Sequence, residues 1–340
     1  MRAMHSLDNK IQLAHGGGGR LSSILINDEI VPRFGKGPLT GLPDAATLGP
    51  ISGKIVFSID SYVVSPYKFN GGNIGNLAVH GTVNDISVSG GRAKWLSIGL
   101  ILEEGFSVSK LQLILDSIKS SADECGVEIV TGDTKVVKKG QCDGIYINSS
   151  GIGEKIKDFH LSKSRLSEGD AIIVSGNIGD HGMAILSVRE GIDMGNGPVS
   201  DTASVQNLVL AIQQYALQVK FMRDPTRGGV AAVLNEIVSG TKVGVTLDSN
   251  KIPVSPEANA LSEILGIDIL NVACEGRMIL ICDKGVANNI LSIWKSLPEG
   301  RNASILGYIN NEAQRVILKT ITGGSRLVDV PTGELLPRIC

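Results

Sequence analysis

The sequence has no long apolar run, few aromatic residues and no cluster of basic residues. A membrane-spanning helix needs about 18 or more consecutive apolar residues, and no stretch of this chain approaches that length. The first ten residues, MRAMHSLDNK, do not contain the apolar segment of a signal peptide. The net charge is −2, with lysine and arginine scattered along the chain. We therefore expect a cytoplasmic protein with no membrane and no nucleic-acid partner.

The sequence contains few cysteines, and their spacing shows no paired motif. The five cysteines, Cys125, Cys142, Cys274, Cys282 and Cys340, are odd in number and form no C-x-x-C pair. This spacing argues against a disulfide framework and against a zinc site. We expect reduced thiols, the first four of them in or near the core. Cys340, the last residue of the sequence, is the one that this expectation leaves unexplained.

The two best-known nucleotide-binding signatures are also missing. The chain contains no G-x-x-x-x-G-K-[ST] loop and no G-x-G-x-x-G turn with an acidic partner, so neither a P-loop enzyme nor a Rossmann dehydrogenase is favoured. Glycine itself is abundant, at 42 of 340 residues against a usual share of about 7%. It gathers in HGGGGR (15–20), GGNIG (71–75), SGGR (89–92), TGD (131–133), SGNIGDHG (175–182) and RGG (227–229). Such clusters beside periodic segments predict loops around a ligand site.

Hydrophobic periodicity predicts alternating strands and helices. Residues 54–60 alternate Ile55, Phe57 and Ile59 on one face, as in a half-buried strand. Residues 109–126 have helical spacing and end at Gly126, a favourable residue after a helix. Further strands are expected at 127–133, 144–153, 171–174, 243–248, 277–282 and 315–319, and a further helix at 230–238. The pattern predicts an α/β protein.

The length of 340 residues suits two domains. A polar, charged stretch at 154–168 marks the expected boundary between them. From about residue 322 the sequence loses its periodicity, and Pro331 and Pro337 disfavour regular structure. We expect this segment to be an extended arm that ends in LPRIC. The terminal carboxylate would raise the pKa of the Cys340 thiol and Arg338 would lower it, and sequence does not decide between them.

Five aspartates occur where glycine-rich turns meet strands: Asp44, Asp60, Asp85, Asp133 and Asp224. A single aspartate in such a place is usually a turn former or helix cap. Five in one context instead suggest ligands for Mg²⁺, which prefers carboxylate and phosphate oxygens. The HGGGGR loop adds amide N–H groups and an arginine for phosphate. Together these features predict a nucleotide site.

A combination of motifs closely resembles one known family. These motifs are LAHGGGGR, DSYVVSPYKFNGGNIGNLAVHGTVNDISVSGG, ILEEGF, VTGDTKVV, RDPTRGGV, ACEGR and the final PRIC. They resemble the HypE family of hydrogenase maturation factors, which are carbamoyl dehydratases. That family lies within a wider ATP-binding group, the PurM-like group of aminoimidazole ribonucleotide synthetase, selenophosphate synthetase and thiamine monophosphate kinase. The resemblance extends from about residue 11 to residue 340.

The resemblance implies a two-domain PurM-like α/β (α+β) fold. It implies an N-terminal segment with the phosphate loop (1–40), an N-terminal ATP-binding and dimerisation domain (41–155), a C-terminal α/β domain (165–322) and a flexible tail (323–340). The N-terminal domains of two copies would pair into a homodimer, their strands closing a barrel-like sheet.

The implied activity is the ATP-dependent dehydration of a carboxamide on Cys340 to an S-cyanide, which supplies the cyanide ligands of the [NiFe]-hydrogenase iron. ATP and Mg²⁺ are the implied cofactors. The carbamoyltransferase HypF is the implied donor, and the HypC–HypD scaffold complex the implied cyanide acceptor. In this scheme the tail would swing, exposed for carbamoylation and inserted for dehydration.

The resemblance also assigns roles to residues of this sequence. The implied metal ligands are Asp44, Asp60, Asp85 and Asp133. The implied ATP and phosphate contacts are His15, Gly17, Gly18, Gly19, Arg20, Asp224 and Arg227. The implied catalytic residues are Cys340, Lys135 and Glu275. Lys135 lies two residues beyond Asp133, so an extended strand would point both side chains to the same side.

Alternatives remain open on sequence alone. Glu275 could be a surface carboxylate before the 277–282 strand, and RDPTRGG could be a helix start capped by Asp224 or Thr226. Another enzyme of the wider group, acting on a free small molecule, would not need the tail. A non-enzymatic scaffold with Cys340 as a docking thiol would not bind ATP.

Overall fold

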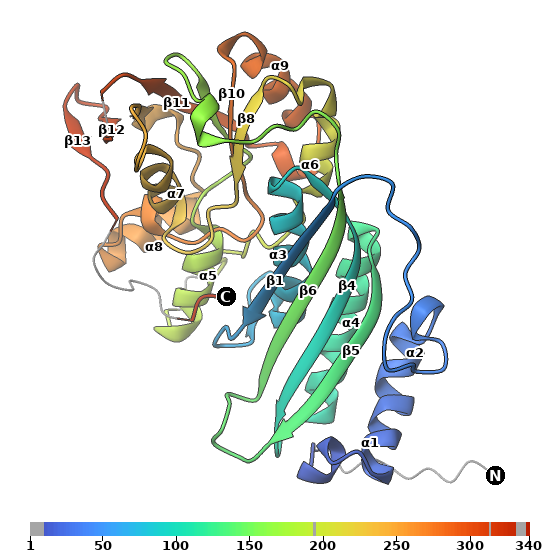
Figure 1. Cartoon of the computed structure of the whole chain (residues 1–340). Coiled ribbons are helices and arrows are strands. Elements are labelled where there is room, and N and C mark those ends of the chain that lie inside the picture. The colour runs from blue at the N-terminus through green and yellow to red at the C-terminus, as the bar shows by residue number, and fades with distance from the viewer. Residues whose placement is uncertain (1–9, 193–194, 313, 331–337) are drawn as a thin grey trace.

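The computed structural model describes residues 10–192, 195–312, 314–330 and 338–340. The chain forms two α/β domains, each built on its own sheet, and the last three residues lie where the domains meet (Figure 1). Pro331 and Pro337, which we expected to stiffen the tail, lie outside the described residues. No helix in the described ranges is both long and apolar enough to cross a bilayer.

The N-terminal domain contains a four-stranded sheet in the order β1-β6-β4-β5. Its strands are β1 (Ile55–Tyr62), β4 (Gly91–Glu103), β5 (Glu128–Val137) and β6 (Ile145–Lys155). β6 pairs antiparallel with both β1 and β4, whereas β4 and β5 run parallel and are joined through helix α4 (Val108–Cys125). A two-stranded ladder of β2 (Lys68–Phe69) and β3 (Gly72–Asn73) precedes helix α3 (Ile74–Val88).

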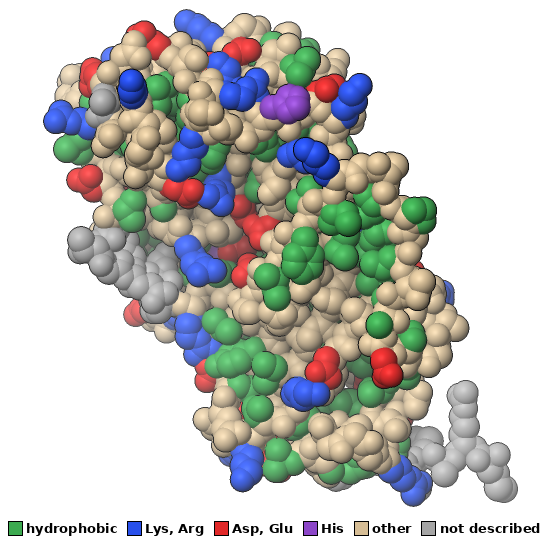
Figure 2. Space-filling view, viewed as in Figure 1, with side chains coloured by type: hydrophobic (Ala, Val, Ile, Leu, Met, Phe, Trp, Pro, Cys, Tyr) green, Lys and Arg blue, Asp and Glu red, His purple; other side chains and the backbone are tan. Residues whose placement is uncertain are grey.

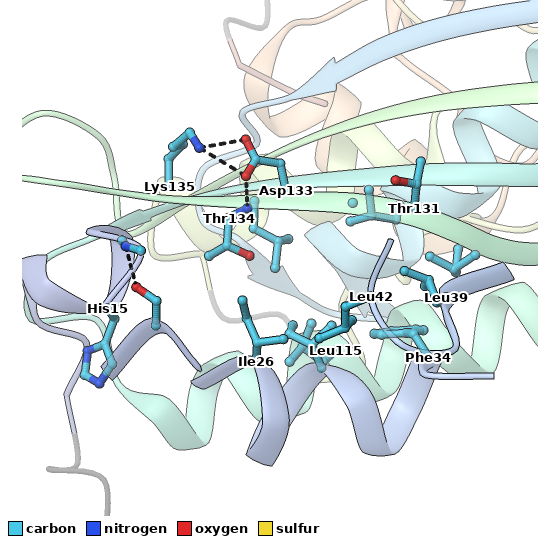
Figure 3. Close-up of a pocket in the computed structure, with 18 of the residues that line it drawn as sticks. His15, Ile26, Phe34, Leu39, Leu42, Leu115, Thr131, Asp133, Thr134 and Lys135 are labelled. Carbon is cyan, nitrogen blue, oxygen red and sulfur yellow. Dashed lines mark hydrogen bonds and ion pairs between the residues drawn. The ribbon is translucent and has the colours of Figure 1, made fainter. Parts of the chain in front are cut away.

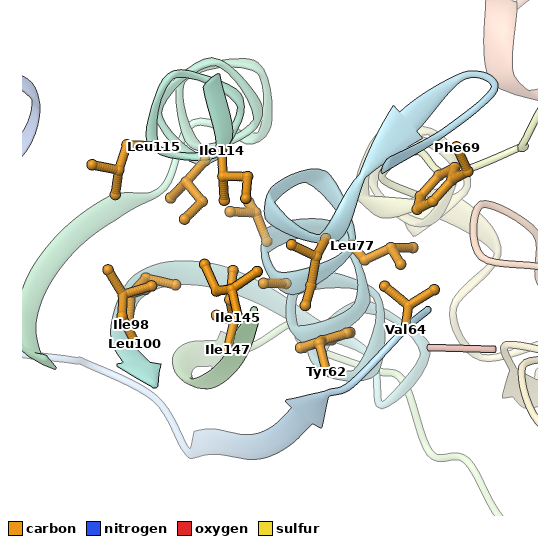
Figure 4. Packing of buried hydrophobic residues seen from close by; sticks show 14 of the residues in the cluster. Tyr62, Val64, Phe69, Leu77, Ile98, Leu100, Ile114, Leu115, Ile145 and Ile147 are labelled. Atoms are coloured by element: carbon orange, nitrogen blue, oxygen red, sulfur yellow. The ribbon is translucent and has the colours of Figure 1, made fainter. Parts of the chain in front are cut away.

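Helices α3 and α4 cover one face of this sheet (Figure 1). The α4 residues that we expected at helical spacing are buried, and the helix ends at Gly126, whose φ of 65° is the left-handed conformation that glycine adopts at little cost. The core beneath the helices joins α4 residues such as Leu115 to the inner face of the sheet, including Ile98 and Ile147 (Figure 4). Helix α3 is buried along most of its length because the C-terminal domain covers its other side.

The opposite face of the sheet is left uncovered in one chain. Ile55, Phe57 and Ile59 of β1 are 64%, 62% and 60% exposed, and Figure 2 shows hydrophobic side chains gathered on the face of the N-terminal domain turned to the viewer. The predicted strand is confirmed, but the expectation that its apolar face is the buried one is wrong. The alternation of apolar residues identifies the apolar face of β1, but helices α3 and α4 pack on the opposite face of the sheet.

The segment before β1 is mostly helical and lies beside β5 and α4 (Figure 1). It comprises a 3₁₀ turn (Leu13–Gly16), α1 (Arg20–Leu25), a π-helical turn (Ile26–Ile30), α2 (Val31–Phe34) and a second 3₁₀ turn (Gly37–Leu39). Leu25 and Leu39 are buried against the N-terminal core, and Arg33 pairs with Asp116 of α4 at 2.6 Å. These contacts fix the glycine-rich loop at 15–20 beside the edge strand β5.

The C-terminal domain contains a seven-stranded sheet in the order β13-β12-β9-β11-β7-β10-β8. The strands are β7 (Ala171–Val174), β8 (Val219–Arg223), β9 (Gly244–Asp248), β10 (Ile279–Cys282), β11 (Ser304–Asn310), β12 (Val316–Lys319) and β13 (Ser325–Leu327). All neighbours are antiparallel except the parallel pair β9 and β12. β13 corrects the expectation that no regular structure follows residue 322.

Helices cover both faces of this sheet, and the residues between form two separate cores. One core includes α7 (Gly229–Val238), and the other includes α6 (Gln206–Ala211) and α9 (Lys284–Lys295). Helices α5 (Asp180–Arg189) and α8 (Pro256–Leu265) instead contribute to the N-terminal core. Shorter 3₁₀ turns occur at Lys163–Arg165, Gln213–Tyr215, Ser249–Lys251, Ile269–Asn271 and Pro298–Gly300. The two domains therefore share one apolar core at their junction.

Several acidic residues differ from their expected local setting. Asp85 lies within α3 rather than at a strand end, and Asp60 and Asp133 lie inside β1 and β5. Helix α7 has Gly228 at its N-cap, so neither Asp224 nor Thr226 caps it. The side chain of Asp224 is thereby available for another role. Cys125, Cys142, Cys274 and Cys282 are buried and free, as predicted.

Candidate functional site

A cavity of about 510 Å³ lies between the N-terminal helical segment, α4 and the edge strand β5. We call it the N-terminal pocket (Figure 3). His15, Gly16, Gly18 and Asp44 line it from the N-terminal segment, and Thr134 lines it from β5. Asp133 and Lys135 of β5 border the cavity, with their charged ends across the strand from its apolar wall. Apolar side chains form much of the remaining wall, among them Ile26, Phe34, Leu39 and Leu115. A cavity of this size, with an apolar wall and a polar rim, suits a nucleotide-sized ligand.

The glycine-rich loop needs its glycines for two different reasons. Gly18 has a φ of 75°, which disfavours any residue with a side chain. At Gly16 a Cβ atom would lie 2.6 Å from the backbone nitrogen of Val136, so only glycine lets the loop approach β5 this closely. His15 is buried, and among the described residues its Nε2 has no hydrogen-bond partner. Gly17, Gly19 and Arg20 are exposed in the same loop but do not line the cavity.

Asp133 and Lys135 form an exposed ion pair on β5, with 2.9 Å between Nζ of Lys135 and Oδ2 of Asp133. The predicted same-side placement of the two side chains is therefore correct. The hydrogen bond from Lys135 lowers the pKa of Asp133, so this carboxylate is charged at neutral pH. An exposed pair of this kind adds little to stability and is free to rearrange around a ligand.

The C-terminal residues 338–340 are docked between the domains, and we call their surroundings the tail site. The backbone nitrogen of Val63 donates to the Cys340 oxygen at 3.1 Å, and that of Ser65 donates to the Arg338 oxygen at 3.3 Å. The Ile339 side chain is 4% exposed within the shared core, a burial that stabilises docking by about 1.5–3 kcal/mol before entropy is counted. The inserted position of the tail is thus a favourable state.

Acidic side chains surround the docked thiol. Asp60 of β1 lies 4.0 Å from the guanidinium of Arg227, and Ser58 donates to Asp85 at 2.6 Å. Burial, and then the charge of Asp85, raises the pKa of Asp224 to about 7. Burial and then the charge of Asp60 also raise the pKa of Asp85, against the hydrogen bond from Ser58. Figure 2 shows acidic side chains in a hollow between the two domains.

Glu275 is the most deeply buried of these acids, at 3% exposure. It is therefore not a surface carboxylate before β10. Burial, followed by the charges of Asp224 and Asp201, raises its pKa well above the usual range. Its Oε1 has no hydrogen-bond partner among the described residues. A buried, unpaired carboxyl oxygen with a raised pKa is typical of an acid–base group awaiting a ligand.

The same surroundings strongly shift the pKa of the Cys340 thiol. Burial, and then the charge of Glu275, raises its pKa to about 12, while Arg227 acts in the opposite direction. The cation near the thiol is therefore Arg227 rather than Arg338, whose guanidinium pairs with Asp143 and lies 5.7 Å from the Tyr146 ring centre. In this position Cys340 is a neutral thiol held beside a carboxyl group.

Within one chain, the predicted metal ligands lie in two separate groups. Asp44 and Asp133 belong to the N-terminal pocket, and Asp60 and Asp85 to the tail site. Strand register connects Asp133 through Gly99 and Asn148 to Ser61, so three inter-strand steps, about 14 Å, separate β5 from β1. Within the described ranges, no three acidic, histidine or cysteine side chains are arranged to hold one metal ion. The four aspartates do not form a single site inside one chain.

Sequence reasoning missed several residues that organise the tail site. Asn84 of α3 donates to the Glu275 oxygen at 3.1 Å and accepts from the Val205 nitrogen, and Asp201 accepts from the Glu275 nitrogen at 3.1 Å. His181 contacts the Ile339 oxygen at 2.8 Å. His181 lies in SGNIGDHG, a glycine cluster identified from the sequence, and a histidine there was the one available signal. Asn84 had a signal of another kind, since it lies in the TVNDISVSGG part of a resemblance motif. Asp201 had none, because it acts across the domain junction.

Both domains of this chain are similar to known protein families. The family model described as AIR synthase related protein, N-terminal domain, matches residues 43–154, and the corresponding C-terminal domain matches residues 167–319. "Carbamoyl dehydratase HypE" of Rhizobium leguminosarum bv. viciae is 41% identical over 341 residues, covering 100% of this chain and 97% of its own.

Two crystal structures are similar throughout. One, of hydrogenase maturation protein HypE in complex with ATP, has a TM-score of 0.92 and 40% identity, and the match covers 97% of this chain and 99% of that one. The other, of a HypE–HypF complex, has a TM-score of 0.80 and 41% identity over 90% of this chain and 99% of that one. The expected two-domain PurM-like fold is confirmed by these matches.

Proposed function

The chain belongs to the HypE family of hydrogenase maturation proteins, and from this membership we propose that it uses ATP to dehydrate a carbamoyl group on its own Cys340. The product is an S-cyanide, which supplies the cyanide ligand of the [NiFe]-hydrogenase iron. The observation that carries the proposal is the docked tail: the Cys340 thiol is buried between the domains, where burial and then the charges of Glu275 and Asp60 raise its pKa.

The chemistry requires an activated oxygen and two proton acceptors. The amide oxygen of S-carbamoyl cysteine is a poor leaving group, and transfer of the γ-phosphoryl group of ATP converts it into phosphate. Loss of phosphate and of both N–H protons then forms the C≡N bond. Overall, S-carbamoyl cysteine and ATP give S-cyanocysteine, ADP and phosphate.

Glu275 is the proton acceptor that we assign to the amide nitrogen. Its Oε1 makes no other bond in the described part of the chain, and its raised pKa makes the ionised carboxylate a strong base. Asn84 donates to the main-chain oxygen of Glu275 and Asp201 accepts from its main-chain nitrogen, so the backbone that carries the carboxyl group is held from two sides. Arg227, at 4.0 Å from Asp60, is the cation of this chain available to the departing phosphate.

The residues present fit ATP and Mg²⁺. Asp44, Asp60, Asp85 and Asp133 offer the carboxylate oxygens that Mg²⁺ prefers, and burial raises the pKa of Asp85, so a bound cation would stabilise its charged form. Mg²⁺ neutralises phosphate charge and orients the phosphoryl group. The proposed phosphate contacts are His15, Gly17, Gly18, Gly19 and Arg20 of the N-terminal segment, together with Asp224 and Arg227 of the tail site. Lys135 is the second proposed proton-handling group.

A homodimer would bring the residues of the N-terminal pocket close to the residues of the tail site. Asp133 and Lys135 are in register with Ser61 and its outward-facing neighbours, so they project from the uncovered face that carries Ile55, Phe57 and Ile59. An apolar face of this kind normally pairs with another surface. We propose that the same face of a second copy covers it, closing a barrel-like sheet, and that each copy's β5 residues approach the other copy's tail site.

The partners follow from the family. The HypE–HypF crystal structure supports HypF as the carbamoyl donor for this chain, and we propose the HypC–HypD complex as the cyanide acceptor, in the cytoplasm. Both steps require the tail to leave its docked position, since the inserted Cys340 is a buried, neutral thiol. The proposed cycle therefore alternates an exposed and an inserted tail.

Mass spectrometry of the C-terminal peptide tests the proposal. After incubation with HypF, carbamoyl phosphate and ATP, Cys340 should first gain a carboxamide and then lose the mass of one water. The Cys340→Ala variant should bind ATP like the unmodified chain and form no cyanide. An enzyme acting on a free small molecule would leave Cys340 unmodified, and a scaffold without enzymatic activity would show no heat of ATP binding in calorimetry.

A further inference from the structure

The carbonyl oxygen of Ile339, immediately before the substrate cysteine, has a dedicated partner. Nε2 of His181 lies 2.8 Å from it. A carbonyl oxygen can only accept, so Nε2 must carry the hydrogen. His181 is fully buried, which excludes water as a competing partner.

The other nitrogen of His181 fixes this proton arrangement. Nδ1 lies 2.8 Å from Oγ of Ser200, and the same Oγ accepts from the Thr202 nitrogen at 3.2 Å. In a neutral imidazole with hydrogen on Nε2, Nδ1 is an acceptor, so the Ser200 hydroxyl donates to it. Burial lowers the pKa of His181, which keeps this neutral form at neutral pH. Both ring nitrogens and the hydroxyl are thus satisfied.

The ring is also held in orientation by both domains. The Phe69 ring packs edge-on against it, with 5.3 Å between ring centres and an interplanar angle of 89°. The Ser200 nitrogen donates to the Asn70 oxygen at 2.9 Å, which connects the loop carrying Ser200 to the N-terminal domain. His181 itself belongs to α5 of the C-terminal domain. The donor that reaches the tail is therefore preorganised before the tail arrives.

We propose that His181 is a positioning residue for the dehydration step: its Nε2–H group holds the Ile339 carbonyl and thereby fixes the backbone that presents Cys340 in the tail site. This role rests on the proposed function, because it concerns how the carbamoylated tail is presented. His181 does not touch the reacting atoms. The recognition is of the tail backbone, so it acts equally on the free and the carbamoylated cysteine.

Two substitutions at His181 and one matched control test the role in the full-length chain. His181→Phe keeps a planar buried ring and removes both nitrogens, whereas His181→Gln retains an amide donor for Ile339. The control is His80→Phe, since His80 is also buried in the described structure but bonds to Thr202 and not to the tail. Unfolding temperature is measured for each variant, to separate local from global effects.

The first readout is the rate at which iodoacetamide alkylates Cys340, measured on its peptide. Loss of a buried hydrogen bond should raise this rate about tenfold or more in His181→Phe. His181→Gln should restore most of the protection, and His80→Phe should match the unmodified chain. The second readout is single-turnover dehydration of the carbamoylated chain, which should slow in His181→Phe and recover in His181→Gln, with ATP affinity unchanged.

Unchanged alkylation and dehydration rates in His181→Phe would overturn the role, as would a His181→Gln variant that is as impaired as His181→Phe. If His181→Phe does not fold, Ser200→Ala replaces it: it leaves the tautomer unfixed and should give a smaller increase in alkylation. No increase with Ser200→Ala would then count against the proposal. Alkylation of Cys340 does not depend on turnover, so it tests the role of His181 separately from the dehydratase function. If the proposed function fails, the carbamoylated chain without substitutions will not lose water, but the differences in alkylation rate between the variants will remain.

Discussion

The N-terminal pocket and the tail site contain the same kinds of side chain in opposite surroundings. In the pocket, Asp133 is an exposed carboxylate whose pKa is lowered by Lys135. In the tail site, Glu275 is buried among other acids and its pKa is raised well above the usual range. One region thus contains a carboxylate that is charged at neutral pH, and the other a carboxyl group that gains a proton more readily.

The two regions also differ in how complete they are within one chain. The tail site is closed by the chain's own residues 338–340, through backbone bonds and the buried Ile339 side chain. The N-terminal pocket is open, and Asp133 and Lys135 project from a sheet face that no part of the described chain covers. This difference agrees with the proposal that the tail supplies the substrate from within the chain and that a second copy covers the open sheet face.

Glu275→Gln should have the largest effect and separate the two regions most clearly. Removing the proton acceptor should reduce the single-turnover dehydration rate by about 10²–10⁴-fold, with little change in ATP affinity. The amide has the same shape as the protonated acid, so the unfolding temperature should not fall. A comparable loss of ATP binding, measured by calorimetry, would contradict the division of roles.

Phe57→Asp tests whether the uncovered face completes the pocket. A charge at a position 62% exposed in one chain should leave the fold intact but weaken the dimer by about 10–100-fold, since a buried phenylalanine contributes about 1.5–3 kcal/mol. Sedimentation velocity at several concentrations measures the shift. Phe57→Leu, which keeps the face apolar, should remain dimeric, and an unchanged dimer in Phe57→Asp would disprove this interface.

Lys135→Met should act on the nucleotide side without loosening the tail. Loss of one charge-assisted contact to phosphate should weaken ATP binding by about tenfold and slow dehydration. Protection of Cys340 from alkylation without nucleotide should stay the same. Lys139→Met, a neighbouring exposed lysine outside the pocket lining, is the control. Increased alkylation in Lys135→Met alone would place Lys135 in the tail site of the same chain.

The smallest effect concerns pH. The docked Cys340 thiol has a pKa of about 12 against an ordinary 9.0. A raised pKa in the docked state means that docking is fully stable below pH 9.0 and weakens as pH rises toward 12. The alkylation rate of Cys340 should therefore keep rising above pH 9.0, whereas that of a free peptide of residues 331–340 should level off there. A plateau in the protein at the same pH as the peptide would show that the tail is not docked.

Much of the fold was predictable because local patterns carry it. The strand at 54–60, the helix ended by Gly126 and the α/β alternation all follow from periodicity and from residues with special backbone freedom. Burial was less predictable, as β1 shows: its apolar residues are on one face as expected, but that face is uncovered. Asp85 shows the same limit, because its position in a helix depends on α3 continuing through a segment that also resembles a turn.

The candidate site divides in the same way. The motifs that carry the family resemblance include Cys340, Glu275, Lys135 and the glycine-rich loop, and the comparisons support that family. The roles of these individual residues stay predictions. His181 and Asp201 were not predictable as site residues, because their relevant contacts span 158 and 74 positions of sequence. Asn84 lies in a resemblance motif, but its contact with Glu275, 191 positions away, was not predictable.

The sequence by itself determined which chemical groups this protein has: glycines that let a loop approach a strand, aspartates and a lysine near them, and a cysteine as the last residue. Only the tertiary structure decided what each group can do. Burial between two domains raises the pKa of Glu275 and Cys340, and two intervening strands keep Asp133 away from Asp60. The reason is physical: proton affinity and ligand geometry depend on the distance to charges and to water, and long-range packing sets both.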